Sequence, residues 1–596
     1  MTVPAKSIKL ITCLAVSLLS LSSALVVFWQ NSRLTVLWDL SYILENSYRI
    51  SLGDMPYRDF PFPYAPLTFL TQALLIKLTG RVFIHHVIYC AVVEVVCVLV
   101  TWQILRRILS GVYSGEVLAT LLSAPLVVLG IYCIFPHPFY DPDCTMMVLF
   151  CLLLFLTWSS DKTSTLQSIL TGMFVPIPVF IKQNTGLAFV ASVLTALVLL
   201  LLLDLLRHQR IVRYLLFVIG FIISCAVALG LVHRTAGLGN YVLWTVKFAA
   251  QRRTPAWSEM LGIYTEPHLK WWLAIALAAI ILLAWKKSNA KLKGLAVAML
   301  SAPFVWPVIY LFLDDDPSER AERLVNLWPL TLILAVFVIA ITFRRRTKAE
   351  LLLTISIVGT VNGAFLSQQL WGSTYALWPL FLILIALALR ALLELSTSDE
   401  KVGVQTLSTH VWSTFFISVL SLSLLIAGQF YMKSHERLDY ANLDDGDLMH
   451  SKLPALRGMS MRGSWIPNFE ELVSYVDKNI PSGDGILCLP GEDPFYYSTG
   501  RRPQFPVLMF DHTVNPLSPE QIVETARERN IKWLITKNDL QLEEEPLEKK
   551  DQLMALLEKD FESVESLDNY EIYKRKSVDE PKDEDDSADS DDNEKP

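Results

Sequence analysis

The chain has 596 residues, of which 53% are hydrophobic and 18% are charged, and its net charge is −7. Apolar runs of about twenty residues recur from residue 8 to residue 431, and each is long enough to cross a bilayer as a helix. The short alternating segments of a transmembrane β-barrel are missing. These features exclude a water-soluble globular protein and predict a polytopic α-helical membrane protein with no nucleic-acid partner.

About thirteen membrane spans are predicted, and basic clusters test their number. Arg106 and Arg107 end the second span, and Arg344, Arg345 and Arg346 follow the tenth. With thirteen alternating spans, these and the other basic clusters all fall on one side, which the positive-inside rule makes the cytoplasm. The predicted spans are residues 8–30, 83–109, 114–134, 143–159, 164–181, 186–206, 213–233, 271–285, 294–313, 326–343, 350–366, 374–394 and 411–431.

The first predicted outer loop, residues 31–82, combines acids, bases, aromatic residues and prolines. Apolar residues at helical spacing over 38–49 predict an amphipathic helix that lies on the membrane. A second short interfacial helix is predicted at 67–79. Asp39 belongs to the polar face of the first helix. A carboxylate at this place either caps the helix or acts as a base at the membrane face, and the sequence leaves both interpretations open.

Three further groups of polar residues fall at predicted outer ends of spans. Two aspartates in FPHPFYDPDC stand at a helix N-terminus, where carboxylates often cap, but carboxylates with a histidine also suit a divalent cation. The lysine of FIKQNTG either snorkels or binds a phosphate or sugar. An outward arginine pair calls for an anionic partner, a lipid headgroup or a lipid-linked phosphate. The substrate-binding candidates are His137, Asp141, Asp143, Lys182, Gln183, Asn184, Arg252 and Arg253, and Asp141 and Asp143 are also candidate metal ligands.

The composition changes after the last span. A polar linker is predicted at 432–466, and alternating helix and strand signals at 467–576 predict a small extracytoplasmic α/β domain. Residues 577–596 form an acidic tail that is predicted to be disordered. The domain has no glycine-rich phosphate loop and no nucleophile elbow.

The order of these pieces resembles the GT-C superfamily of polytopic membrane glycosyltransferases, which includes the protein O-mannosyltransferases and the lipid A aminoarabinose transferases. The resemblance rests on Asp39 after the first span, the GDMPYRDF and YAPL pieces, Asp141 before Pro142, and LPGEDPFYYSTGRRP and NYEIYKRK in the outer domain. It implies inverting transfer of a sugar from a polyprenyl-phosphate donor to a glycan, lipid or protein acceptor. The reaction would take place at the outer face of the inner (cytoplasmic) membrane.

The resemblance also implies roles for single residues. Asp39 matches the first-loop acid, which takes or positions the proton of the acceptor hydroxyl. Members often have Asp-Glu there, whereas this chain has Asp39-Leu40, so Asp59 is a candidate second acid. Apart from the resemblance, the charge of Arg58 makes it a candidate phosphate contact, and Tyr57 beside it is a candidate substrate contact. A transporter and a non-catalytic envelope assembly protein remain alternatives. A transporter would need polar groups near the midplane, where Glu94 is the main candidate.

Overall fold

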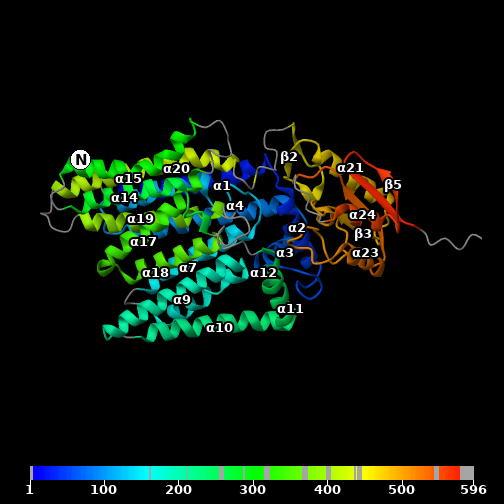
Figure 1. The fold of residues 1–596 in the computed structure, drawn as a ribbon, viewed down its shortest axis with the longest axis horizontal. Helices are drawn as coiled ribbons and strands as arrows, with labels where there is room; N and C mark the ends of the chain where they lie inside the picture. The colour runs from blue at the N-terminus through cyan, green and yellow to red at the C-terminus, as the bar shows by residue number, and fades with distance from the viewer. Residues whose placement is uncertain are drawn as a thin grey trace, which may run out of the picture.

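The computed structural model describes residues 5–159, 163–209, 211–253, 261–285, 289–313, 323–365, 374–396, 404–434, 438, 446–541 and 549–576. A long helical part is joined at one end to a smaller α/β domain (Figure 1). The helical part contains α1 (Ala5–Asn31), α2 (Leu37–Ser51), α3 (Leu67–Thr79), α4 (Phe83–Ile108), α5 (Gly115–Ser123), α6 (Leu126–Leu129), α7 (Tyr140–Trp158), α8 (Thr165–Phe174), η1 (Ile177–Phe180), α9 (Gln183–Leu206), α10 (Val212–Thr235), α11 (Leu238–Val242), η2 (Leu243–Phe248), α12 (Ala249–Arg253), α14 (Pro267–Ala284), α15 (Ala290–Tyr310), α17 (Leu327–Ile341), η3 (Phe343–Arg345), α18 (Lys348–Phe365), η4 (Thr374–Ala376), α19 (Trp378–Ser396) and α20 (Val404–Ser434).

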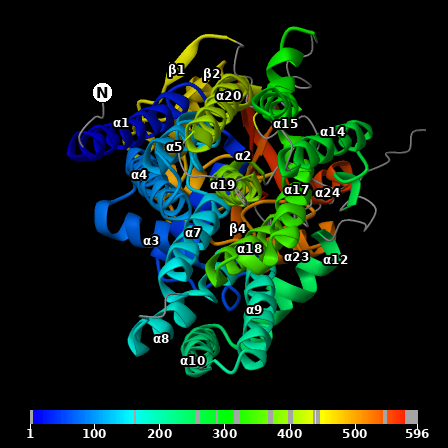
Figure 2. The same cartoon turned by 90° about the vertical axis from the view of Figure 1, so that its left-hand side faces the viewer.

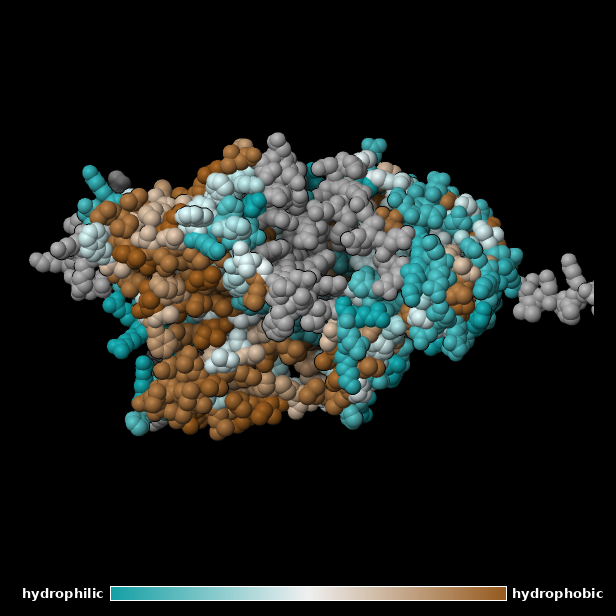
Figure 3. Space-filling view, viewed as in Figure 1, coloured by the Kyte–Doolittle hydropathy of each residue, from teal (hydrophilic) through white to brown (hydrophobic). Residues whose placement is uncertain are grey.

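The helical part has the surface of a membrane protein. Among the described residues, ten helices are long and apolar enough to cross a bilayer. Hydrophobic side chains cover the outside of these helices, whereas the α/β domain is mostly hydrophilic (Figure 3). The chain is therefore a multi-pass membrane protein.

Each of the thirteen predicted spans contains helix, but two are broken. The range 114–134 divides into α5 and α6 at Pro125, and the range 164–181 divides into α8 and η1 at Pro176. Proline lacks the N–H that would continue the helical hydrogen bonding. The predicted span at 350–366 corresponds to the continuous helix α18, which has 18 residues and carries Lys348 and Glu350 in its first turn.

Glu94 stabilises the irregular backbone that follows α6. Its carboxylate accepts the N–H of Tyr132 at 3.0 Å, and a Cβ at Gly130 would come within 2.0 Å of Glu94 Oε1. Irregular backbone inside a membrane protein needs such internal partners because lipid offers none. This contact gives Glu94 a structural role, distinct from the transport role that a midplane carboxylate suggests.

The predicted basic and outer loops gather at opposite ends of the helical part. Far from the α/β domain, Asp204 at the end of α9 binds Arg213 and Lys348 at 2.7 Å each. At the other end, α2, α3, α11 and α12 lie beside the α/β domain (Figures 1 and 2). The structure thus separates the two sets of loops that the charge pattern assigned to two sides.

The predicted helices at 38–49 and 67–79 are present as α2 and α3, but α2 is enclosed on both faces. Leu40 and Leu44 are fully buried, and Glu45 and Arg49 on the polar side are only 3% and 5% exposed. The α/β domain covers this polar side (Figure 1). An amphipathic pattern does not show whether the polar side of a helix faces water or a second domain. The sequence alone therefore predicts a helix on the membrane surface.

The α/β domain has a four-stranded sheet of order β3-β4-β6-β5, in which β3 and β4 are parallel and the other pairs are antiparallel. The prediction missed β5, because only its first residue, Phe561, is buried. Residues predicted as linker hold the antiparallel pair β1 and β2. The elements are β1 (Leu448–His450), η6 (Pro454–Leu456), β2 (Ser460–Arg462), α21 (Trp465–Asn479), β3 (Gly485–Leu489), α22 (Phe495–Thr499), α23 (Pro519–Glu528), β4 (Ile531–Lys537), α24 (Lys550–Leu557), β5 (Phe561–Ser566) and β6 (Tyr570–Arg575). The predicted acidic tail, 577–596, lies outside the described residues.

Candidate functional site

Asp39 stands in the first turn of α2, a helix that begins without a cap of its own. Val36 occupies the N-cap position and has no side-chain acceptor. Two distant residues accept the first N–H groups instead: His137 Nε2 accepts from Val36 at 3.3 Å, and Gln541 Oε1 accepts from Leu37 at 2.7 Å. Orphan N–H groups at a helix start need such partners. The position of Asp39 therefore depends on both contacts.

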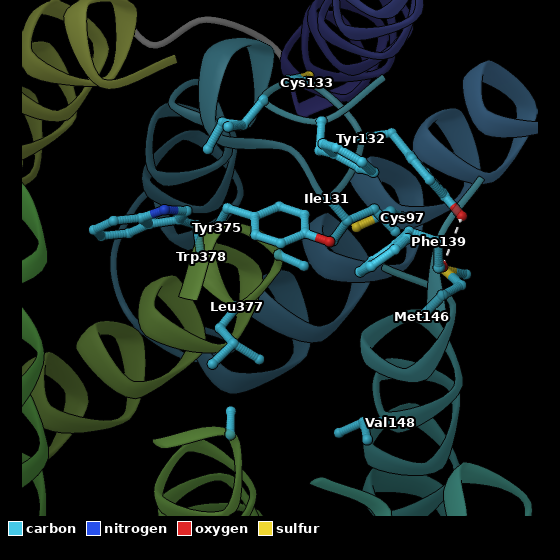
Figure 4. Packing of buried hydrophobic residues seen from close by; sticks show 14 of the residues in the cluster. Cys97, Ile131, Tyr132, Cys133, Phe139, Met146, Val148, Tyr375, Leu377 and Trp378 are labelled. Carbon is cyan, nitrogen blue, oxygen red and sulfur yellow. Dashed lines mark hydrogen bonds between the residues drawn. The ribbon is translucent and has the colours of Figure 1, made fainter. Parts of the chain in front are cut away.

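His137 contributes structure at this point. It is completely buried, and burial lowers its pKa to about 3. A neutral imidazole has one nitrogen that can accept a hydrogen bond, as the contact to Val36 requires. The loop that carries it is packed firmly, since the rings of Phe135 and Phe139 meet edge to face with their centres 5.1 Å apart, and the Phe135 ring lies 5.9 Å from that of Tyr375. Phe139 and Tyr375 belong to the buried cluster drawn in Figure 4.

A buried ion pair lies at the same end of the helical part. Asp141 at the start of α7 binds Lys182, the residue before α9, and the two are only 5% and 6% exposed. Asp141 Oδ2 has no hydrogen-bond partner within the described ranges. Lys182 Nζ also lies 5.7 Å from the centre of the Tyr140 ring. Burying two charges is costly unless they serve each other or a ligand, so this pair marks a candidate site.

Aromatic rings connect this ion pair to α2. Tyr42 lies 5.0 Å from Tyr64, and Tyr64 lies 5.2 Å from Tyr140, measured between ring centres. Tyr42 follows Asp39 by three residues and so shares its helix face. A series of ring contacts thus connects α2 with Tyr140, the neighbour of Asp141 in the sequence. Tyr64 and Tyr140 were not predicted as connectors, although they stand in the YAPL and FPHPFYDPDC segments.

Gln183 and Asn184 stand in the first turn of α9, next to Lys182. Gln183 Nε2 donates to the carbonyl of Pro63 at 2.9 Å, which joins α9 to the first loop. Asn184 is half-buried. These two predicted residues therefore lie at the site, and Gln183 helps to hold the first loop against it.

Both carboxylate oxygens of Asp143 already accept hydrogen bonds. It accepts hydrogen bonds from the hydroxyls of Tyr132 at 2.7 Å, Thr68 at 2.8 Å and Tyr89 at 2.8 Å. Asp141, two residues earlier, is paired with Lys182. The described part of the chain has no group of three or more His, Cys, Asp or Glu side chains that could hold a metal ion. This donor set does not fit a resident divalent cation at Asp141 and Asp143.

Asp59, the candidate second acid, is bound by its neighbour Arg58. Arg58 Nε and Nη2 each donate to the Asp59 carboxylate at 2.8 Å, and the N–H of Met55 donates to it at 2.7 Å. The Arg58 hydrogen bonds are the main reason that the pKa of Asp59 falls to about 2. Asp59 is therefore ionised but already engaged, and Arg58 is engaged by it.

The remaining predicted contacts join parts of the molecule. The hydroxyl of Tyr57 donates to the carbonyl of Tyr64 at 2.7 Å, and its ring lies 5.1 Å from Tyr241. Arg252 Nη1 donates to the carbonyl of His512 at 2.8 Å, which connects α12 to the α/β domain. The side chain of Arg253 lies outside the described part. In this state Tyr57 and Arg252 stabilise the surroundings of the site.

Glu45 is a further buried carboxylate, and it binds α2 to the α/β domain. Glu45 Oε1 accepts the N–H of Tyr497 at 2.9 Å, and the Tyr48 hydroxyl donates to the carbonyl of Gly500 at 2.7 Å. Glu45 Oε2 has no hydrogen-bond partner among the described residues. Burial raises the pKa of Glu45 from 4.5 to about 8. The folded protein therefore keeps this carboxyl protonated at neutral pH.

We expect the stability of the protein to fall from about pH 4.5 to about pH 8 through Glu45, between its unfolded and its folded pKa. A folded pKa above the unfolded one means that folding binds a proton, so this contribution is fully present below the unfolded value and is lost as the pH rises through the folded value. Thermal unfolding of the purified protein across this range should show the decline. Glu45→Gln, which stays neutral, should flatten it, and an unchanged decline in that variant would assign the effect to another group.

Comparisons with known proteins bear on the fold. No protein family model matches the chain, and no curated protein matches it. The apo crystal structure of ArnT from Cupriavidus metallidurans is similar over 94% of this chain and 97% of that chain, with a TM-score of 0.52 and 10% identity. The chain has the GT-C glycosyltransferase fold.

Two further solved structures match the chain more weakly. ArnT bound to undecaprenyl phosphate matches with a TM-score of 0.47 and 11% identity over 94% of this chain and 97% of that chain. An Archaeoglobus fulgidus oligosaccharyltransferase in complex with Zn and sulfate matches with the same TM-score and identity, over 87% of this chain and 68% of that chain. The match to apo ArnT, with its TM-score of 0.52, confirms for the fold the GT-C resemblance that the sequence shows.

Proposed function

We propose that this protein is an inverting glycosyltransferase that moves a sugar from a polyprenyl-phosphate donor to an acceptor at the outer face of the cytoplasmic membrane. The buried pair of Lys182 and Asp141, which aromatic rings connect to the helix whose first turn holds Asp39, carries the proposal within a GT-C fold. ArnT, which has this fold, has been crystallised with undecaprenyl phosphate.

Lys182 would stabilise the leaving phosphate. As the bond between the anomeric carbon and the phosphate oxygen breaks, negative charge grows on that oxygen, and a fixed cation lowers the energy of this state. An ammonium group has three N–H donors, so Lys182 can keep its bond to Asp141 and still contact phosphate. Asp141 holds the cation in place and compensates its charge when no substrate is bound.

Asp39 would act on the acceptor. The acceptor hydroxyl oxygen forms the new bond to the anomeric carbon from the face opposite the phosphate, and its proton passes to the Asp39 carboxylate. The polyprenyl phosphate leaves with the electron pair of the broken bond. Attack from the opposite face inverts the anomeric configuration. The acceptor is a hydroxyl of a glycan, a lipid or a protein.

The outer face is proposed from charge. The end of the helical part that bears the α/β domain lies opposite the end where Arg213 and Lys348 gather. Since basic loops are retained in the cytoplasm, the α/β domain and the site would be extracytoplasmic. Labelling of an engineered cysteine on the α/β domain in intact cells reports its side directly.

The donor class is tested by binding. Native mass spectrometry of the purified full chain with undecaprenyl phosphate should show a bound lipid, whereas undecaprenol, which lacks the phosphate, should bind at least tenfold more weakly. Lys182 is the expected reason for this difference, since it supplies the cation. Equal binding of the two lipids would contradict a phosphate site and favour a transporter or an assembly protein.

A further inference from the structure

Gln541 of the α/β domain holds the start of α2 by two hydrogen bonds, and the Thr35 hydroxyl also donates to the carbonyl of Ser460 at 2.8 Å. Gln541 Oε1 accepts the N–H of Leu37 at 2.7 Å, and Gln541 Nε2 donates to the carbonyl of Thr35 at 2.9 Å. One side-chain amide thus binds two backbone groups, one on either side of Val36, the residue that precedes the helix. Gln541 is 7% exposed, and Thr35 and Leu37 are fully buried. Both bonds therefore lie away from competing water.

Gln541 is itself fixed by a buried charge cluster. Its backbone N–H donates to Glu492 Oε1 at 2.8 Å, and the other oxygen of Glu492 binds Lys537 at 2.7 Å. Lys537 also binds Asp493 at 2.9 Å. Glu492 and Lys537 are 1% and 5% exposed. A satisfied network of this kind is rigid, because moving any member leaves a buried charge uncompensated.

The cluster is anchored in the core of the α/β domain. Lys537 ends β4, and Asp493 accepts hydrogen bonds from Trp465 Nε1 and from the Tyr570 hydroxyl, each at 2.8 Å. Tyr570 begins β6 and Trp465 begins α21. A continuous set of hydrogen bonds and ion pairs therefore runs from the central sheet to the first turn of α2, which carries Asp39.

We propose that Gln541 is a positioning residue for Asp39, and that the α/β domain is part of the catalytic apparatus through it. The inference rests on the proposed role of Asp39. Because α2 has no N-cap side chain of its own, its first turn is fixed by Gln541 and His137. Loss of the Gln541 contact lets this turn fray, and a displacement of about 1 Å at a reacting group can cost about a hundredfold in rate.

The amide chemistry gives a sharp test variant. Gln541→Glu keeps the size of the side chain but replaces the N–H donor by an oxygen, which then faces the carbonyl oxygen of Thr35. The bond to Leu37 can remain, whereas the bond to Thr35 is lost. Gln541→Asn keeps the amide but is too short to reach both groups, and it serves as a second variant. Gln504→Glu is the matched control, because Gln504 is on the same domain and its amide nitrogen donates to the carbonyl of Gly483 at 3.1 Å.

Three measurements are made on the full-length variants. Hydrogen exchange of the peptide containing residues 35–40 reports the start of α2, native mass spectrometry with undecaprenyl phosphate reports donor binding, and the glycan product per molecule of protein in a complemented deletion strain reports transfer. We expect faster exchange, binding within twofold of wild type and a product loss of about tenfold or more for both Gln541 variants. Gln504→Glu should match wild type in all three.

The outcomes separate this inference from the proposed function. Asp39→Asn is measured in parallel. If Asp39→Asn abolishes the product while both Gln541 variants retain wild-type product, or retain wild-type exchange at residues 35–40, the positioning role is refuted and the proposed function stands. If Asp39→Asn keeps full activity, Asp39 is not the base and the positioning role of Gln541 fails with it, whereas unchanged glycans in the deletion strain would refute sugar transfer itself.

Discussion

Replacing Asp39 by asparagine should lower sugar transfer by about 10²–10⁴-fold, the usual contribution of a general base. The amide keeps the size and most hydrogen-bonding geometry of the carboxylate but cannot take the acceptor's proton. Because the fold around α2 is fixed by His137 and Gln541, stability should change little. Product per molecule of protein in membranes of a complemented deletion strain measures the effect, and binding of undecaprenyl phosphate should be unchanged.

Asp59→Asn is the control for this variant, since Asp59 is the other candidate acid of the first loop. Its carboxylate is bound by Arg58 and by the N–H of Met55, and exposed ion pairs contribute about 0–1 kcal/mol. Near-normal transfer is expected. A large loss in Asp59→Asn together with full activity in Asp39→Asn would move the base to Asp59.

Replacing Lys182 by methionine should impair both folding and donor binding. Removing one partner of a buried ion pair leaves the other charge uncompensated, at a cost of about 3–5 kcal/mol. Asp141 would be left in this state, since its side chain is nearly inaccessible to water. Lower thermal stability and weaker binding of undecaprenyl phosphate are both expected. Lys77→Met, at an exposed lysine of α3, should change neither.

The double variant Lys182→Met, Asp141→Asn separates the two effects. With no charge left in the pair, the free energy of unfolding should recover most of its loss, because an uncharged buried pair carries no desolvation penalty. Binding and transfer should stay low, because the phosphate still lacks its cation. Recovery of transfer in the double variant would show that the pair serves the fold alone.

Local patterns were enough to predict much of the fold. Apolar spacing located α2 and α3 almost to the residue, and the strand signals at 485–490, 532–536 and 570–574 located β3, β4 and β6. The exposed edge strand β5 was not predicted, because only Phe561 is buried and the strand shows no alternation of buried and exposed residues. Helix propensity could not show that Pro125 breaks the predicted span at 114–134 or that Pro176 breaks the one at 164–181, since proline is tolerated in many membrane helices.

The candidate site was only partly visible in the sequence. Asp39, Asp141 and Lys182 were each identified from their place at the end of a span, but nothing in the sequence paired the last two. The contacts that fix α2 join residues 101 and 504 positions apart, at His137 and Gln541. Such distant pairings follow from the tertiary fold and leave no periodic signal. Gln541, in a loop without a motif, was therefore missed.

Comparative glycan mass spectrometry of envelope lipids and proteins is the most direct test of the central claim. It compares a deletion strain with the same strain carrying the wild-type chain. Loss of one sugar modification on deletion, with return in the complemented strain, is the result predicted for a polyprenyl-phosphate glycosyltransferase. Identical glycans in the two strains would contradict sugar transfer and leave transport or envelope assembly as the function of this GT-C fold.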